Sequence, residues 1–129
     1  FLNWKNFRKF RYDVVKSKLN LYKILNKIVK RKDKIYGIGA PSRASTLINY
    51  LGLTNEIMQY VCEIEGSYKI GNYMPGTNIP IVSEKKLYQD KPQYAMLLSW
   101  HISKELISNL RKKGFKGKFI IPLPKPRIV

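Results

Sequence analysis

A glycine-rich turn is the clearest candidate for chemistry in this sequence. Residues 37–42 read Gly-Ile-Gly-Ala-Pro-Ser and directly precede Arg43. Small residues at this spacing allow a tight strand-to-helix turn, and the backbone N–H groups that begin a helix attract anions. Arg43, Ser45 and Thr46 add side-chain donors that suit a phosphate. The turn starts like a dinucleotide-binding fingerprint but has Ser42 in place of the third glycine, so a turn without a ligand explains it equally well.

Two further clusters contain groups that could bind a sugar or move a proton. Glu63 and Glu65 follow an apolar run, where dinucleotide-binding folds place the acid that holds ribose hydroxyls. His101, beside Trp100, could act as a general base or as a hydrogen-bond donor to a sugar. Each cluster also has a simpler interpretation, because a solvated strand end explains the acids and a hydrogen-bonded loop residue explains the histidine.

Residue counts exclude other kinds of active site. The sequence has one histidine, one cysteine and scattered acids, which cannot complete a metal site. The residues also offer no triad for nucleophilic catalysis. The single Cys62 excludes an internal disulfide and predicts a reducing, cytoplasmic location.

The composition is that of a basic chain with enough apolar residues to fold. Of 129 residues, 44% are hydrophobic and 12% aromatic, which excludes disorder throughout, and no apolar run approaches the length of a membrane span. The net charge is +17, and residues 1–34 hold 12 basic and 2 acidic side chains. This excess predicts attraction to polyanions such as phosphates or nucleic acid, although an AT-rich genome would also enrich lysine.

Helical and extended segments alternate from residue 34 onward. Apolar periodicity and turn residues predict strands at 34–38, 57–64, 79–82, 94–98 and 118–123, and helices at 43–51, 83–88 and 103–113. The sequence therefore predicts an α/β fold, a Rossmann-like parallel sheet of about four to five strands with helices on both faces. Ligands bind such sheets at the carboxyl ends of the strands, where the glycine-rich turn, the two glutamates and the histidine fall.

A long basic helix is predicted before this sheet. Apolar residues recur at helical spacing over residues 6–31, among them Phe10, Val14 and Leu21. At ~1.5 Å per residue, a continuous helix would be longer than the diameter of so small a domain. We therefore expect it either to break near residues 17–20 or to lean on a neighbouring domain. Its aromatic residues could stack on nucleic-acid bases, but half-burial against the domain is the simpler interpretation.

Four stretches of sequence carry a resemblance to a known family. They read GIGAPSRASTLIN at residues 37–49, PGTNIPI at 75–81, SWH at 99–101 and GKFIIPLPKPR at 117–127. Together they resemble the C-terminal domain of the S-adenosylmethionine-dependent sugar C-methyltransferases, over roughly residues 33–129. The second and fourth stretches are the specific ones.

The resemblance implies an enzyme of three domains that acts on a nucleotide-linked deoxysugar. A small zinc-binding domain comes first, a domain that binds S-adenosylmethionine comes second, and a Rossmann-like domain closes over the nucleotide-sugar. Residues 34–129 would form the third domain and residues 1–33 the connection from the second. This segment would then bind neither zinc nor S-adenosylmethionine. It would be inactive alone, because the catalytic base is expected on the second domain.

The resemblance also implies substrate-binding or nucleotide-binding positions. Glu63 stands where the family tends to have Asp, His101 stands where many members have Asn, and the loop before Lys69 is one residue longer than the common pattern. These departures leave the sugar and the nucleotide open. By resemblance, Arg43 takes the place of a usual Lys, and Thr46, Asn49, Lys69 and Gly71 match the family's pattern. The turn chemistry and the resemblance together give the candidate binding residues Gly37, Gly39, Ala40, Ser42, Arg43, Ser45, Thr46, Glu63, Lys69, Thr77, Trp100 and His101.

Two other functions are compatible with the sequence. A basic module that binds nucleic acid through residues 1–34 would have an affinity that falls steeply with salt. A free-standing nucleotide-binding domain would instead be complete as it stands. The specific turns favour the nucleotide-sugar over nucleic acid as the ligand, and a membrane is not expected to be a partner.

Overall fold

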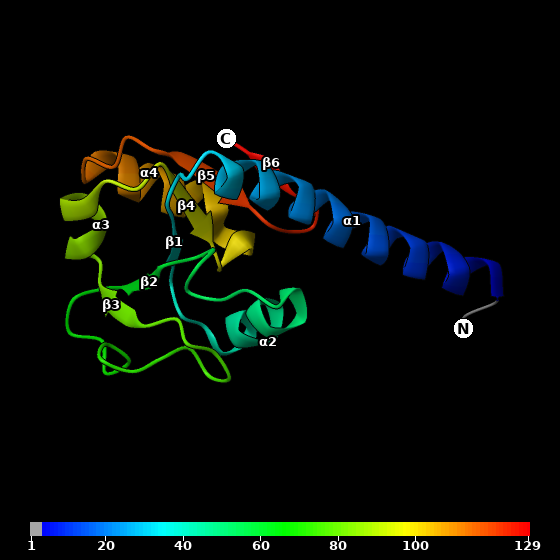
Figure 1. Ribbon diagram of the computed structural model, residues 1–129, viewed down its shortest axis with the longest axis horizontal. Coiled ribbons are helices and arrows are strands. Elements are labelled where there is room, and N and C mark those ends of the chain that lie inside the picture. Colours follow the sequence, from blue (N-terminus) through cyan, green and yellow to red (C-terminus); the bar gives the residue numbers. More distant parts are fainter. Residues whose placement is uncertain (1–3) are drawn as a thin grey trace.

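The computed structural model describes residues 4–129, apart from the side chains of Phe7, Ser42 and Arg43. A long helix is followed by an α/β unit (Figure 1). The elements are α1 (Trp4–Lys30), β1 (Ile35–Ile38), α2 (Ser42–Leu51), β2 (Tyr60–Glu63), β3 (Ile81–Ser83), α3 (Lys85–Asp90), β4 (Tyr94–Leu97), a 3₁₀ turn (Trp100–Ile102), α4 (Ser103–Lys112), β5 (Lys118–Ile121) and β6 (Arg127–Ile128). Within this described part, no helix is both long and apolar enough to cross a membrane.

The strands form one sheet in the order β3-β2-β1-β4-β5-β6. The pairs β2/β3, β1/β2, β1/β4 and β4/β5 are parallel, whereas β6 runs antiparallel to β5. The α/β class and the parallel sheet predicted from the sequence are therefore confirmed. The predicted four to five strands do not include β6, because this strand has only two exposed residues and follows Pro124 and Pro126, which favour turns.

Both faces of the sheet are buried, because successive residues of a strand point to opposite faces. Ile35 and Met96 belong to a buried cluster that includes residues of α1 and α2. Their chain neighbours Tyr36 and Leu97 belong to a second cluster with residues of α3 and α4. Helices on both faces agree with the prediction from the sequence.

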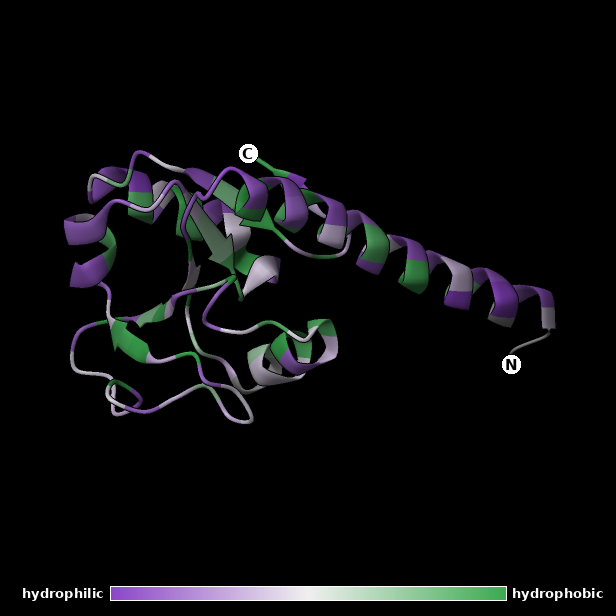
Figure 2. Ribbon diagram, in the orientation of Figure 1, coloured by the Kyte–Doolittle hydropathy of each residue, from purple (hydrophilic) through white to green (hydrophobic). Residues whose placement is uncertain are grey.

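Helix α1 is continuous from Trp4 to Lys30, so the break considered near residues 17–20 does not occur. Its aromatic residues are not half-buried throughout, because Trp4 and Tyr12 are 73% and 64% exposed. The amino-terminal part of the helix projects beyond the sheet (Figure 1). Hydrophobic and hydrophilic residues both occur along this projecting part (Figure 2).

The carboxyl-terminal part of α1 is integral to the fold. Leu21, Leu25 and Ile28 are each at most 3% exposed and belong to the cluster that fills one face of the sheet. Their spacing of four and three residues places them on one side of the helix. The α/β unit therefore includes at least these last turns of α1.

The lone thiol of Cys62 gives a test of this core. Cys62 is buried in β2, and its pKa is raised from 9.0 to about 12, first by burial and then by the nearby carboxylates of Glu84 and Asp90. Because folding raises this pKa, the thiol favours the folded state below about pH 9, and this contribution is lost as the pH rises toward 12.

We therefore expect the native protein at pH 8 to react with a disulfide reagent at least ~100-fold more slowly than the urea-unfolded chain. Absorbance of the released thiolate measures both rates. Equal rates would contradict the burial of β2.

Candidate functional site

The candidate site starts from the turn after β1, at the edge of the crevice between β1 and β4, where the strand order reverses. The chain leaves β1 toward one side of the sheet and β4 toward the other, and in open parallel sheets this crevice binds ligands. Gly39 follows β1 with φ = 84°, a conformation that side chains strongly disfavour. A Cβ at this position would lie 3.5 Å from Oγ of Ser99, which follows β4. At that distance a Cβ would make an ordinary contact, so the positive φ, rather than the available space, favours glycine here.

Gly37 has a different role from Gly39. It lies inside β1 and is buried, and a Cβ added there would lie only 3.0 Å from Leu98 Cδ1 and Met58 Sδ. The absence of a side chain thus permits close packing beneath the site. The structure places Gly37 in the core, away from the surface of the turn.

Ala40, at the centre of the turn, is held through both of its backbone polar groups. Its N–H donates to Glu63 Oε1 at 2.8 Å, and its carbonyl accepts a hydrogen bond from Lys69 Nζ. The preceding N–H, that of Gly39, donates to the Cys62 carbonyl at 2.8 Å. Glu63 and Lys69, which the resemblance implies as ligand contacts, therefore bind the turn itself.

A surface hollow of about 440 Å³ opens beside this turn. We call it the α2 hollow, because Pro41 and Ser45 at the start of α2 form one wall and the loop before β3 forms the other. It is lined by Ala40, Pro41, Ser45, Tyr68, Lys69, Asn72, Tyr73, Met74, Pro75 and Ile81. Tyr68 and Tyr73 are 86% and 61% exposed, so their rings are accessible at its edge.

Sequence reasoning does not identify these two tyrosines. The available signal is the composition of residues 65–78, where two aromatic residues occur among glycines and Pro75 without the alternation of a strand. Exposed aromatic residues in such a loop suggest a binding surface rather than a core.

The Pro-Gly-Thr stretch forms a tight turn against α2. Gly76 has φ = 75°, and a Cβ there would meet the Asn49 side chain at 3.0 Å. Asn49 Nδ2 donates to the Pro75 carbonyl at 3.1 Å. Thr77 Oγ1 donates to the Met74 carbonyl at 2.8 Å and accepts the N–H of Ile79. The structure therefore uses Thr77 to close this turn, and Thr77 does not line the α2 hollow.

Trp100 and His101 follow β4 and do not line the α2 hollow. Trp100 is partly buried and packs against both core clusters. The exposed His101 ring meets the Trp100 ring edge-on, with centroids 6.2 Å apart. Thr46 is exposed on α2, whereas the side chains of Ser42 and Arg43 lie outside the described part of the structure.

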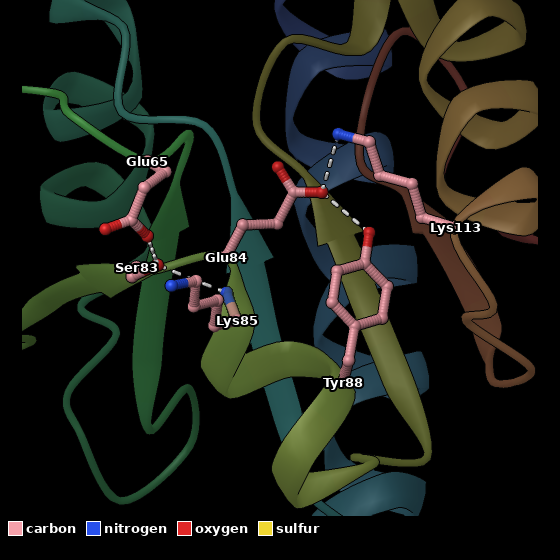
Figure 3. A network of polar contacts seen from close by, with 6 residues as sticks. All are labelled: Glu65, Ser83, Glu84, Lys85, Tyr88 and Lys113. Carbon is pink, nitrogen blue, oxygen red and sulfur yellow. Dashed lines mark hydrogen bonds and ion pairs between the residues drawn. The ribbon is translucent and has the colours of Figure 1, made fainter.

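The acids near β3 form a network of structural contacts (Figure 3). Glu65 accepts a hydrogen bond from Ser83. Glu84 Oε1 accepts one from the Tyr88 hydroxyl at 2.6 Å and pairs with Lys113 Nζ at 3.2 Å. Burial raises the pKa of Tyr88, and its hydrogen bond to Glu84 adds to the effect. The network joins α3 to the end of α4 and leaves Glu65 engaged beside β3.

The described residues contain no group of three or more histidine, cysteine, aspartate or glutamate side chains placed to hold a metal ion.

Replacing Glu63 tests how the turn is held. In Glu63→Ala the Ala40 N–H loses its acceptor, and we expect the free energy of unfolding to fall by about 1–3 kcal/mol. Glu63→Gln retains a carbonyl oxygen and should lose less. Glu56→Ala, which removes an exposed glutamate, is the control. Urea unfolding measures all three, and an alanine variant at position 63 as stable as the wild type would show that this hydrogen bond does not hold the turn.

Comparison with known proteins identifies the family of this chain. A family model described as the C-methyltransferase C-terminal domain matches residues 1–124, and the match includes α1. The C-methyltransferase NovU of Streptomyces niveus is 29% identical over 126 residues, which cover 95% of this chain. The chain spans 29% of the length of that relative. The chain therefore belongs to the family of C-methyltransferase C-terminal domains.

Proposed function

We propose that this domain binds the diphosphate end of a nucleotide-linked sugar in the α2 hollow. It would be the substrate-binding and closing domain of an S-adenosylmethionine-dependent C-methyltransferase. The observation that carries the proposal is the position of the hollow, at the amino terminus of the ten-residue helix α2 and beside the carboxyl end of β1. The amino terminus of a helix attracts phosphate through its N–H groups and its dipole.

Two ends of the hollow suit two parts of such a ligand. Arg43, in the first turn of α2, and the N–H groups of that turn would bind the diphosphate. Tyr68 and Tyr73 offer exposed rings on which a nucleobase can stack. Glu63 and Lys69 would act indirectly, because they hold Ala40 and so fix the turn against which the phosphates lie. The net charge of +17 adds a general attraction for an anionic ligand.

The remaining parts of the reaction are assigned to domains that precede this one. Residues 1–33 would be the connection from a domain that binds S-adenosylmethionine, the source of the methyl group, and the last turns of this connection also pack into the α/β unit. Zinc would belong to the first domain. A base of the preceding domain would remove a proton next to a keto group of the sugar, and the enolate would attack the methyl carbon. Residues 34–129 orient the substrate and cover it. We place the enzyme in the cytoplasm, where Cys62 stays reduced.

A titration of the isotope-labelled chain, followed by amide NMR signals, tests the substrate. With a thymidine or uridine diphospho-sugar, we expect shifts confined to residues 39–46 and 63–77. S-adenosylmethionine should cause none. A short DNA duplex at two salt concentrations is the third ligand, because shifts along residues 5–34 with DNA alone would replace this proposal with nucleic-acid binding. Turnover by the 129-residue chain alone would contradict its assigned inactivity.

Arg43→Ala tests the phosphate contact in the intact enzyme. Losing a charged hydrogen-bond donor should raise KM for the nucleotide-sugar roughly tenfold and leave kcat nearly unchanged. Lys104→Ala, which removes a positive charge from an exposed position of α4, should alter neither constant. Equal decreases of kcat and kcat/KM in the Arg43 variant would instead show that Arg43 stabilises the transition state of the reaction.

A further inference from the structure

The apolar side of α1 is longer than the surface that it covers. Leu21, Leu25 and Ile28 are buried against the sheet. Phe10 and Val14 lie on the same side, since 4, 7 and 11 residues correspond to nearly whole helical turns. Yet Phe10 is 65% exposed and Val14 is 40% exposed. A side of the helix that is core in one half is therefore uncovered in the other.

This uncovered side forms one wall of a second hollow, of about 480 Å³, which we call the α1 groove. Helix α2 and the segment after β5 contribute to the other walls, and Trp100 also lines the groove. The groove is lined by Phe10, Asp13, Val14, Ser17, Lys18, Leu21, Leu47, Tyr50, Leu51, Trp100, Pro122, Leu123 and Pro124. Most of these side chains are apolar, so the groove suits an apolar occupant.

Polar contacts hold the walls of the α1 groove in place. Ser17 Oγ donates to the Pro124 carbonyl at 3.3 Å, and the Tyr22 hydroxyl donates to the Leu51 carbonyl at 2.6 Å. The ammonium group of Lys18 lies 4.1 Å from the centroid of the Tyr50 ring. The groove is thus formed before anything binds, which lowers the entropic cost of docking.

The positive charge of α1 limits which molecules could occupy the α1 groove. Helix α1 carries nine basic residues and one acidic residue, so a second copy of this chain would bring two strongly positive surfaces together. The groove itself is lined by one acidic and one basic side chain, Asp13 and Lys18, and its basic surroundings come from the rest of α1. Such surroundings suit an apolar protein surface with an acidic border. A phosphate group is bound through charge and hydrogen bonds, so the apolar walls of the groove would contribute nothing to binding it.

Another domain of the same protein is the expected source of an apolar surface with an acidic border. The family is that of a C-terminal domain, and the matched region is only 29% of the length of the C-methyltransferase relative. The match also includes α1, the element nearest in sequence to the rest of the relative. A domain in the same chain docks intramolecularly wherever the connection lets it reach the groove, so a smaller apolar contact suffices than between separate chains.

We propose that the α1 groove is the docking site for the methyltransferase domain that precedes this one, which inserts an apolar segment with an acidic border. The inference rests on the proposed function only for the existence of that preceding domain. It does not depend on the proposed nucleotide-sugar site. Docking there would bring the preceding domain against Trp100 at the end of β4. Trp100 would then be a contact between the domains.

Hydrogen exchange in the intact enzyme, compared with the 129-residue chain, tests the proposal. We expect the amides of residues 8–20 and 121–123 to exchange at least tenfold more slowly in the intact enzyme. The double variant Phe10→Asp/Val14→Asp should abolish this protection. The control Tyr12→Asp/Val15→Asp adds the same charge at exposed positions on another side of the helix and should retain it.

A second measurement uses two separate chains. The 129-residue chain should bind the separately produced preceding domain in calorimetry, with an affinity that the Phe10/Val14 variant lowers at least tenfold and the control lowers less than threefold. Circular dichroism of both variants checks that they keep the fold. Neither measurement needs a nucleotide, so a failure of docking is distinguishable from a failure of substrate binding.

Several results would overturn the proposal. Equal exchange of residues 8–20 in the intact enzyme and in the 129-residue chain would show that the groove stays open. Concentration-dependent dimers that the Phe10/Val14 variant abolishes would assign the groove to a second copy. Sedimentation of the intact enzyme with phosphatidylserine vesicles, lost in the same variant, would assign it to a membrane surface.

Discussion

The candidate site depends on the way in which Ala40 is held. Its N–H donates to Glu63, the last residue of β2, and its carbonyl accepts a hydrogen bond from Lys69 in the loop that follows. These contacts join the β1–α2 turn to the loop that forms the opposite wall of the α2 hollow. The shape of the hollow and the orientation of the first turn of α2 therefore depend on each other. A glutamate occupies one N–H of the turn, so an incoming phosphate would meet the N–H groups that follow it.

The fold could be predicted from the sequence because its signals are local. Continuous apolar runs such as Phe119–Ile121 indicate strands buried on both faces, and the structure buries all three residues. The apolar spacing from Phe10 to Ile28 indicates one side of a helix. The spacing of apolar residues does not show what packs against that side of the helix, because burial depends on the rest of the protein. The helix is therefore predicted correctly, whereas the exposure of Trp4 and Tyr12 is not.

The site is only partly readable from sequence, for a different reason. Residue types identify the turn and its charged neighbours, but they do not say which atoms those neighbours contact. Glu63 and Lys69 could bind a ligand or the backbone, and long-range geometry alone shows that they bind Ala40. Thr77 likewise closes a turn. Tyr68 and Tyr73 line the hollow through the path of a long loop, which no periodic pattern encodes.

The two edges of the sheet have a further consequence. The edge strands β3 and β6 have three and two residues, and β6 follows two prolines and begins with the exposed Arg127. Val129 exchanges both backbone hydrogen bonds with Phe119, so β5 has no free edge at that residue. Short, charged or proline-bordered edges are poor templates for a further strand. The short edges thus guard a domain rich in apolar strands against edge-to-edge aggregation, in which one copy would add its strand to the sheet of another.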